Sequence, residues 1–183
     1  MKILLTLALI SILAVPAFAG LDPDPDMMGL YFDEMGDVVC TQAGTFAHVP
    51  VFVLYTRPSV GSVSGFECGI TIDGATNTFM SIFAMPAGFS NAGTATNLRV
   101  TFDSPIYTSK ETVLAELDLY YLEWGTPMAL FIGPSDPSSS PIGKPVVMVP
   151  DEGFMSVGTS VEPGTPAAML NSAPTPPAYC NAK

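Results

Sequence analysis

The sequence has few basic residues and almost no histidine. Lysine and arginine together number 6 against 17 acidic residues, and the 183 residues include one histidine. Phosphate groups are bound mainly by Lys and Arg, so we expect no nucleic-acid partner. A single histidine leaves little room for a histidine-based metal centre or catalytic triad. The formal net charge is -11, yet 48% of residues are hydrophobic, which indicates an acidic folded protein rather than a disordered one.

Long hydrophobic runs are also absent, except at the N-terminus. There Lys2 precedes the apolar run 3–15, and an Ala-Phe-Ala segment ending at Ala19 supplies the small residues that signal peptidase recognises. This pattern predicts a secretory signal peptide over residues 1–19. A membrane-spanning helix needs about 20 apolar residues, and this run is shorter. We therefore expect a secreted protein, extracellular or periplasmic, with no transmembrane anchor in the exported chain.

The exported part predicts one domain between two proline-rich segments. Residues 20–27 form an acidic leader, Gly-Leu-Asp-Pro-Asp-Pro-Asp-Met, whose prolines favour extended backbone. Residues 28–160 contain short alternating segments separated by turns and form the predicted domain. Residues 161–183 are rich in Pro, Ala and Thr without a periodic apolar face, which is typical of a tail.

Alternation of apolar and polar residues predicts about nine short strands and no helix. We expect strands at 28–33, 47–55, 63–72, 78–85, 97–103, 112–122, 128–132, 144–149 and 154–157. Strands that follow one another every 8–12 residues or so, each with one apolar face, are typical of a sandwich or barrel. The sequence therefore predicts an all-β fold in which two antiparallel sheets pack face to face.

The three cysteines all lie in the predicted exported part, where a disulfide is chemically possible. Cys68 shares the apolar face of its strand with Phe66 and Ile70, so we expect a buried free residue. Cys40 and Cys180 are the favoured pair, which would connect the tail to the start of the domain. A Cys40–Cys68 pair is the alternative that the sequence leaves open.

Two consecutive predicted strands resemble cohesin modules. Val49-Pro50-Val51 resembles the family's "VPV" strand, and Val63-Ser64-Gly65-Phe66 resembles the following "V-x-G-F" strand. Segments 92–100 and 112–119 are similar to later strands of the family. The resemblance covers roughly residues 28–150 and departs from the cellulosomal pattern at Ile72-Asp73-Gly74-Ala75, where the "YDP" region is not intact.

This resemblance implies a jelly-roll sandwich of about nine strands, related in shape to carbohydrate-binding modules. Cohesins bind dockerins, and cohesin-like domains also occur in other exported bacterial proteins. The chain shows no scaffoldin repeats and no dockerin duplication. The resemblance therefore implies an exported binding module, and it implies the fold more directly than dockerin binding.

Three aromatic residues are candidates for a sugar-stacking site. These are Trp124, Tyr120 and Tyr31, because aromatic faces suit the C–H groups of sugars. A structural role is the alternative for Trp124, since large aromatic side chains are usually buried.

Alternating acids in the leader are a candidate calcium site. Asp22, Asp24 and Asp26 would offer carboxylate oxygens to Ca²⁺ from one side of an extended chain. The segment lacks the glycine and terminal glutamate of an EF-hand loop. A solvated acidic leader is therefore the favoured interpretation, and we expect no other cofactor.

No catalytic motif is present. The sequence contains no Gly-x-Ser-x-Gly nucleophile motif with which His48 could act, so we expect an exposed or capped structural histidine. Glu67, Glu116 and Asp118 fall on the polar faces of their strands, which predicts solvent exposure rather than a glycosidase pair. The sequence thus predicts a non-catalytic binding or adhesion module for a glycan or an extracellular partner protein. A structural component of an extracellular assembly is the alternative, and a secreted hydrolase is the least favoured.

Overall fold

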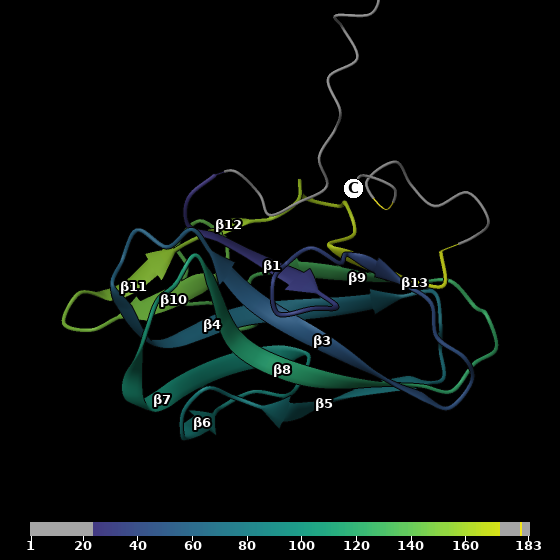
Figure 1. Ribbon diagram of the computed structural model, residues 1–183. Coiled ribbons are helices and arrows are strands. Elements are labelled where there is room, and N and C mark those ends of the chain that lie inside the picture. The colour runs from purple at the N-terminus through teal and green to yellow at the C-terminus, as the bar shows by residue number, and fades with distance from the viewer. Residues whose placement is uncertain (1–23, 173–179, 181–183) are drawn as a thin grey trace, which may run out of the picture.

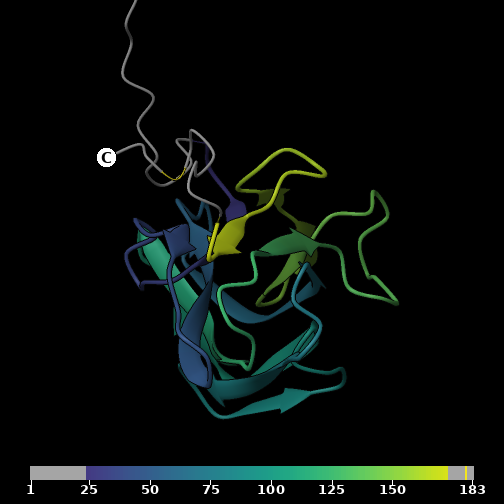
Figure 2. The same ribbon diagram turned by 90° about the vertical axis from the view of Figure 1, so that its right-hand side faces the viewer.

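Thirteen strands form two sheets that pack face to face in the computed structural model, which describes residues 24–172 and Cys180 (Figures 1 and 2). The first sheet has the strand order β12-β1-β3-β8-β5 and is called here the β8 sheet. Its strands are β1 (Met27–Tyr31), β3 (Ala47–Thr56), β5 (Thr78–Ala84), β8 (Glu111–Tyr121) and β12 (Gly158–Thr159).

The second sheet, called here the β4 sheet, has the order β11-β10-β4-β9-β13-β2, with β7 paired to β4 and β6 paired to β7. Its strands are β2 (Cys40–Thr41), β4 (Ser62–Asp73), β6 (Phe89–Asn91), β7 (Asn97–Tyr107), β9 (Met128–Gly133), β10 (Val146–Val149), β11 (Gly153–Ser156) and β13 (Ala168–Leu170). All pairs are antiparallel except β1 with β12 and β13 with β2. The predicted all-β sandwich is confirmed, whereas jelly-roll connectivity stays a prediction.

The core lies between the sheets and follows the alternation of the strands. In β8, Leu117, Leu119 and Tyr121 are fully buried, whereas Glu116 and Asp118 between them are only partly buried. Successive side chains of a strand point to opposite faces, so β8 presents an apolar inner face and a polar outer face. In the β4 sheet the same alternation buries Phe66, Cys68 and Ile70 of β4.

The sandwich extends beyond the predicted domain end at residue 160. Ala168 and Leu170 of β13 are fully buried, and β13 pairs with both β9 and β2. The side chain of Asn171 holds the chain next to Ala43, accepting from its N–H at 2.8 Å and donating to its carbonyl at 3.0 Å. The prediction of a tail from residue 161 is therefore wrong for this part, because strands this short show no periodicity.

The cysteine predictions are confirmed. Cys40 and Cys180 form a disulfide with their Cα atoms 5.4 Å apart, and Cys68 is a buried free cysteine. Within the part of the chain described, no helix has the length and apolar character to cross a membrane. The predicted signal peptide and Asp22 lie outside the described residues.

Replacement of Leu170 by alanine tests the extended domain boundary. Because Leu170 is fully buried, Leu170→Ala should lower the free energy of unfolding by about 2–5 kcal/mol, measured by urea denaturation. The matched control is Met169→Ala, which removes a half-buried side chain of the same strand and should cost less. Equal stability of Leu170→Ala and the wild type would contradict a structural role for β13.

Candidate functional site

The outer face of the β8 sheet carries aromatic and acidic side chains in register across three strands. The rows, read from β3 through β8 to β5, are His48–Tyr120–Phe79 and Pro50–Asp118–Ser81. The intervening residues, such as Leu119 and Met80, point into the sandwich. A β-bulge at Phe83 adds a third aromatic residue beside these rows. We refer to this surface as the outer face.

Aromatic rings on the outer face contact one another and remain open to solvent. The rings of His48 and Tyr120 stack with centroids 4.5 Å apart, and Phe79 meets Tyr120 edge-on at 5.0 Å. Phe79 is 55% exposed and Phe83 is 71% exposed. Exposed phenylalanine rings grouped on one sheet face are unusual for a solvated surface and indicate a contact site.

A hollow of about 320 Å³ lies on the outer face, close to the lower limit of typical ligand sites. It is lined by His48, Pro50, Phe83, Glu116, Leu117 and Asp118. Nδ1 of His48 lies 2.7 Å from Oδ2 of Asp118, which orients both side chains, and the histidine is 67% exposed as predicted. The hollow thus places apolar walls next to two carboxylates and an imidazole.

Trp124 lies at the same end of the β8 sheet as the Tyr120 row. It follows β8 in the connection to β9 and is 86% exposed. Glu123 holds this connection in place, because its carboxylate accepts hydrogen bonds from the N–H groups of Asn77 (2.8 Å) and Thr76 (2.7 Å). The Asn77 hydrogen bond, followed by those from Thr126 and Thr76, lowers the pKa of Glu123 to about 2.

Tyr31 does not belong to this site. Its side chain is 2% exposed and packs with Phe52 and Leu54, and this group is covered by Val39 and Val113. The prediction of Tyr31 as a ligand-stacking residue is wrong, because the segment between β1 and β2 covers this end of the β8 sheet. Of the predicted aromatic residues, the structure leaves Tyr120 and Trp124 on the surface.

Of the three predicted calcium ligands, Asp24 and Asp26 lie among the described residues and Asp22 does not. Asp26 already accepts hydrogen bonds from the Tyr55 hydroxyl and, at 2.8 Å, from the Ser59 N–H. Burial opposes ionisation of Asp26, but these hydrogen bonds outweigh it and lower its pKa. Within residues 24–172 and Cys180, no group of three or more His, Cys, Asp or Glu side chains is placed to hold a metal ion.

Glu67 is buried, contrary to the prediction from its strand pattern. It is 5% exposed, and its carboxylate accepts hydrogen bonds from the Ser139 N–H (3.0 Å), the Ser139 hydroxyl (2.9 Å) and the Ser135 hydroxyl (3.1 Å). Nε of Arg99 lies 3.6 Å from it. Glu67 therefore attaches the β9–β10 connection to the β4 sheet, whereas Glu116 and Asp118 lie on the other sheet.

The chain crosses over Glu67 because Gly69, two residues along the same face, leaves room. A Cβ atom at position 69 would collide with the carbonyl oxygen of Pro134. Asn97 fastens the same connection through two hydrogen bonds with the backbone of Asp136, at 2.6 and 2.9 Å. Alternation alone identifies the outward face of β4 but carries no information on a loop that covers it.

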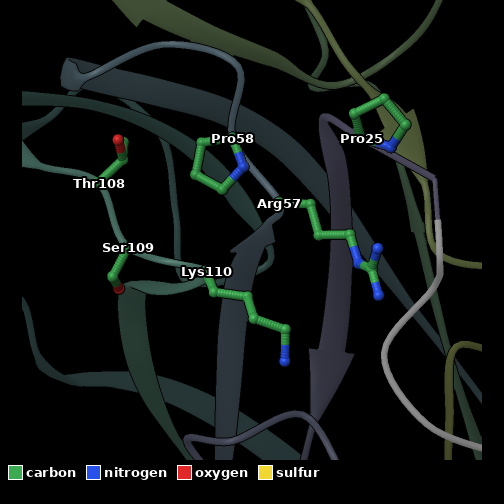
Figure 3. A pocket seen from close by; sticks show the side chains of 6 residues that line it. All are labelled: Pro25, Arg57, Pro58, Thr108, Ser109 and Lys110. Carbon is green, nitrogen blue, oxygen red and sulfur yellow. The ribbon is translucent and has the colours of Figure 1, made fainter.

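A second hollow, of about 670 Å³, lies at the opposite end of β3 (Figure 3). It is lined by Pro25, Arg57, Pro58, Thr108, Ser109 and Lys110. The Thr108 hydroxyl donates to Val60, the Ser109 hydroxyl donates to Glu111, and Lys110 Nζ lies 2.6 Å from the Glu111 carboxylate. Figure 3 shows the two cationic side chains extending away from the hydroxyls, so the polar groups do not converge on one ligand.

No protein-family model, curated protein or solved structure matches the chain. The similarity to cohesin modules therefore stays a prediction from the strand patterns around Val49-Pro50-Val51. The sequence predicted only some residues of the outer face, with Tyr120 among them. Phe79 and Phe83 were missed because β5 has apolar residues on both faces, so its pattern does not show which face is solvated.

Loss of the Glu67 carboxylate tests its structural role. Glu67→Ala leaves Arg99 and two serines without their buried partner and should lower the free energy of unfolding by about 2–3 kcal/mol in urea denaturation. The control Glu116→Ala removes a partly exposed carboxylate of similar strand position and should change stability by less than about 1 kcal/mol. Equal effects in the two variants would contradict the buried role.

The lowered pKa of Glu123 predicts a pH-dependent contribution to stability. The folded state favours the carboxylate, so its contribution is complete above the ordinary pKa of 4.5 and is lost as the pH falls toward about 2. Above pH 4.5 the wild type should unfold at a higher urea concentration than Glu123→Gln. This difference in urea midpoint should shrink as the pH falls from 4.5 toward about 2. The control for loss of a surface charge is Glu152→Gln, since the exposed carboxylate of Glu152 accepts no hydrogen bond from the described residues. A difference that is independent of pH would overturn this assignment.

Proposed function

We propose that the protein is an exported, non-catalytic binding module whose outer face binds a neutral glycan. The observation that supports this proposal is the group of exposed rings beside two carboxylates on β3, β5 and β8. Sugar rings combine apolar C–H faces with hydroxyl donors, and both kinds of group have counterparts here. Phe83 and Pro50 offer apolar walls, and Glu116 and Asp118 offer hydrogen-bond acceptors.

The charge of the site favours a neutral sugar over an acidic one. The imidazole of His48 is the basic group that lines the hollow, and its Nδ1 is already engaged with Asp118. An anionic sugar would approach Glu116 and Asp118 on a chain whose formal net charge is -11, and like charges repel. A neutral sugar would instead donate its hydroxyl hydrogens to these carboxylates, and such charge-assisted hydrogen bonds are strong.

A protein partner is the other occupant that the resemblance to cohesin modules implies. A protein interface has a core depleted of charged residues, whereas Glu116 and Asp118 both line this hollow. The hollow is also small, of about 320 Å³, which suits one sugar unit better than a broad protein contact. The glycan is therefore the occupant that we propose.

A hydrolytic role is less well supported than binding. Glu67 is engaged on the β4 sheet by two serines, so it does not serve a carboxylate pair with Glu116 or Asp118. These two remaining acids project from one strand two residues apart, side by side on an open face. Glycoside hydrolysis needs carboxyl groups on opposite sides of the scissile bond, so this arrangement favours binding.

Glycan arrays with neutral and acidic oligosaccharides test the proposal. We expect the purified protein to bind neutral oligosaccharides, and Tyr120→Ala to weaken binding about tenfold through loss of the ring that contacts His48 and Phe79. Asp118→Asn should weaken binding too, because a carboxylate accepts stronger hydrogen bonds than an amide.

The control is Phe154→Ala, which removes an exposed ring (54%) from β11 on the other sheet. It should leave glycan affinity unchanged, and urea denaturation of each variant should show a folded protein. Absence of any glycan signal, or affinity confined to acidic sugars, would count against the proposal. Binding to a protein partner in place of a glycan would favour the cohesin-type alternative.

A further inference from the structure

Strand β5 ends the β8 sheet with an open edge (Figure 1). It has 7 residues, whereas the other terminal strands are shorter: β12 and β2 have 2 each, β6 has 3 and β11 has 4. Natural edge strands are usually protected by shortness, by charged residues or by proline. The β5 sequence, Thr-Phe-Met-Ser-Ile-Phe-Ala, contains neither charge nor proline. Its bulge at Phe83 is the one protective feature, and it lies near the end of the strand.

The ladder with β8 determines which backbone groups of β5 face the open edge. The N–H of Leu122 donates to the carbonyl of Asn77, so these two residues form a hydrogen-bonded pair. In antiparallel ladders such pairs alternate with pairs whose backbone groups point away. The backbone groups of Thr78, Met80 and Ile82 therefore point to the open edge. No loop or side chain of the described residues bonds to them.

These groups match those of a second copy of the same strand. We consider two β5 strands that lie antiparallel with a two-fold axis at Ser81. Met80 of each copy then lies opposite Ile82 of the other, which gives two equivalent pairs. Both residues present their N–H and carbonyl outward, so both pairs form complete hydrogen-bonded pairs. Ser81 then faces its own symmetry mate in a pair without backbone hydrogen bonds. A two-fold interface requires this kind of self-complementarity.

Side chains support the same register. With the axis at Ser81, Phe79 of each copy lies opposite Phe83 of the other on the outer face. Both rings are more than half exposed in the single chain. Cross-strand aromatic pairs stabilise antiparallel ladders, so the register that joins the backbone also covers these two rings.

We propose that the protein forms a two-fold symmetric dimer by antiparallel pairing of its β5 edges about Ser81. The two β8 sheets then form one continuous sheet, and the outer faces of both copies lie on the same side of it. This inference does not depend on glycan binding, because it rests on the edge rather than on the hollow. The shared surface would place two hollows next to each other.

Cysteine cross-linking tests the register. In a pair without backbone hydrogen bonds the Cα atoms lie about 4.5 Å apart, within the range that a disulfide spans. Under mild oxidation, Ser81→Cys should form a covalent dimer, whereas Ser90→Cys on the exposed strand β6 should not. Cys68 is buried and Cys40 is bonded to Cys180, so neither competes. Equal cross-linking of the two variants would overturn the proposed register.

Sedimentation velocity over a range of protein concentrations tests the dimer itself. We expect a reversible monomer–dimer equilibrium in the wild type. Phe83→Lys places a charge at the edge and removes the aromatic pairs, so it should raise the dimer dissociation constant at least about tenfold. The control Phe154→Lys changes a ring of β11 and should leave the constant unchanged.

Each outcome of these measurements decides the proposal. A wild type that stays monomeric at every concentration would refute it. A dimer that Phe83→Lys does not weaken would show that another surface associates. Because Asp118→Asn changes no residue of β5 and no ring that contacts Phe79, loss of glycan binding with an unchanged dimer separates the two proposals.

Discussion

The pairing of β8 with a strand on each side is the constraint on which the rest of the structure depends. Because β8 lies between β3 and β5, its side chains must follow a period of two over most of its length. The inward set, which includes Leu117 and Leu119, joins the two sheets through the core. The outward set, Glu116, Asp118 and Tyr120, cannot enter that core and forms the centre of the outer face.

Coverage by connecting segments then decides which outward side chains reach solvent. On the β4 sheet the β9–β10 connection passes over Glu67 and turns a strand-surface carboxylate into a buried acceptor. On the β8 sheet Val39 covers Tyr31, but no described segment covers Tyr120 in the same way. The uncovered part of the β8 sheet, from β3 to the open edge of β5, is consequently the surface available for binding and association.

Strand alternation made much of this architecture predictable, because a one-sided apolar pattern has to be buried by a second sheet. It located the long strands to within a few residues and placed Cys68 in the core. It failed for strands such as β2 and β13, since two or three residues cannot display a period. Their formation depends on neighbours distant in sequence, with Met169 beside Cys40 as the example.

The amino-acid sequence by itself determined the all-β class, the strands with one apolar and one polar face, and the absence of a catalytic motif. These features follow from residue type and local periodicity. Tertiary structure alone decided which of two similar positions is exposed. Glu67 and Asp118 occupy equivalent outward positions in their strands, yet one lies under a loop and the other lines a hollow. The difference arises because loop paths depend on distant contacts, such as Asn97 with Asp136, that no local pattern records.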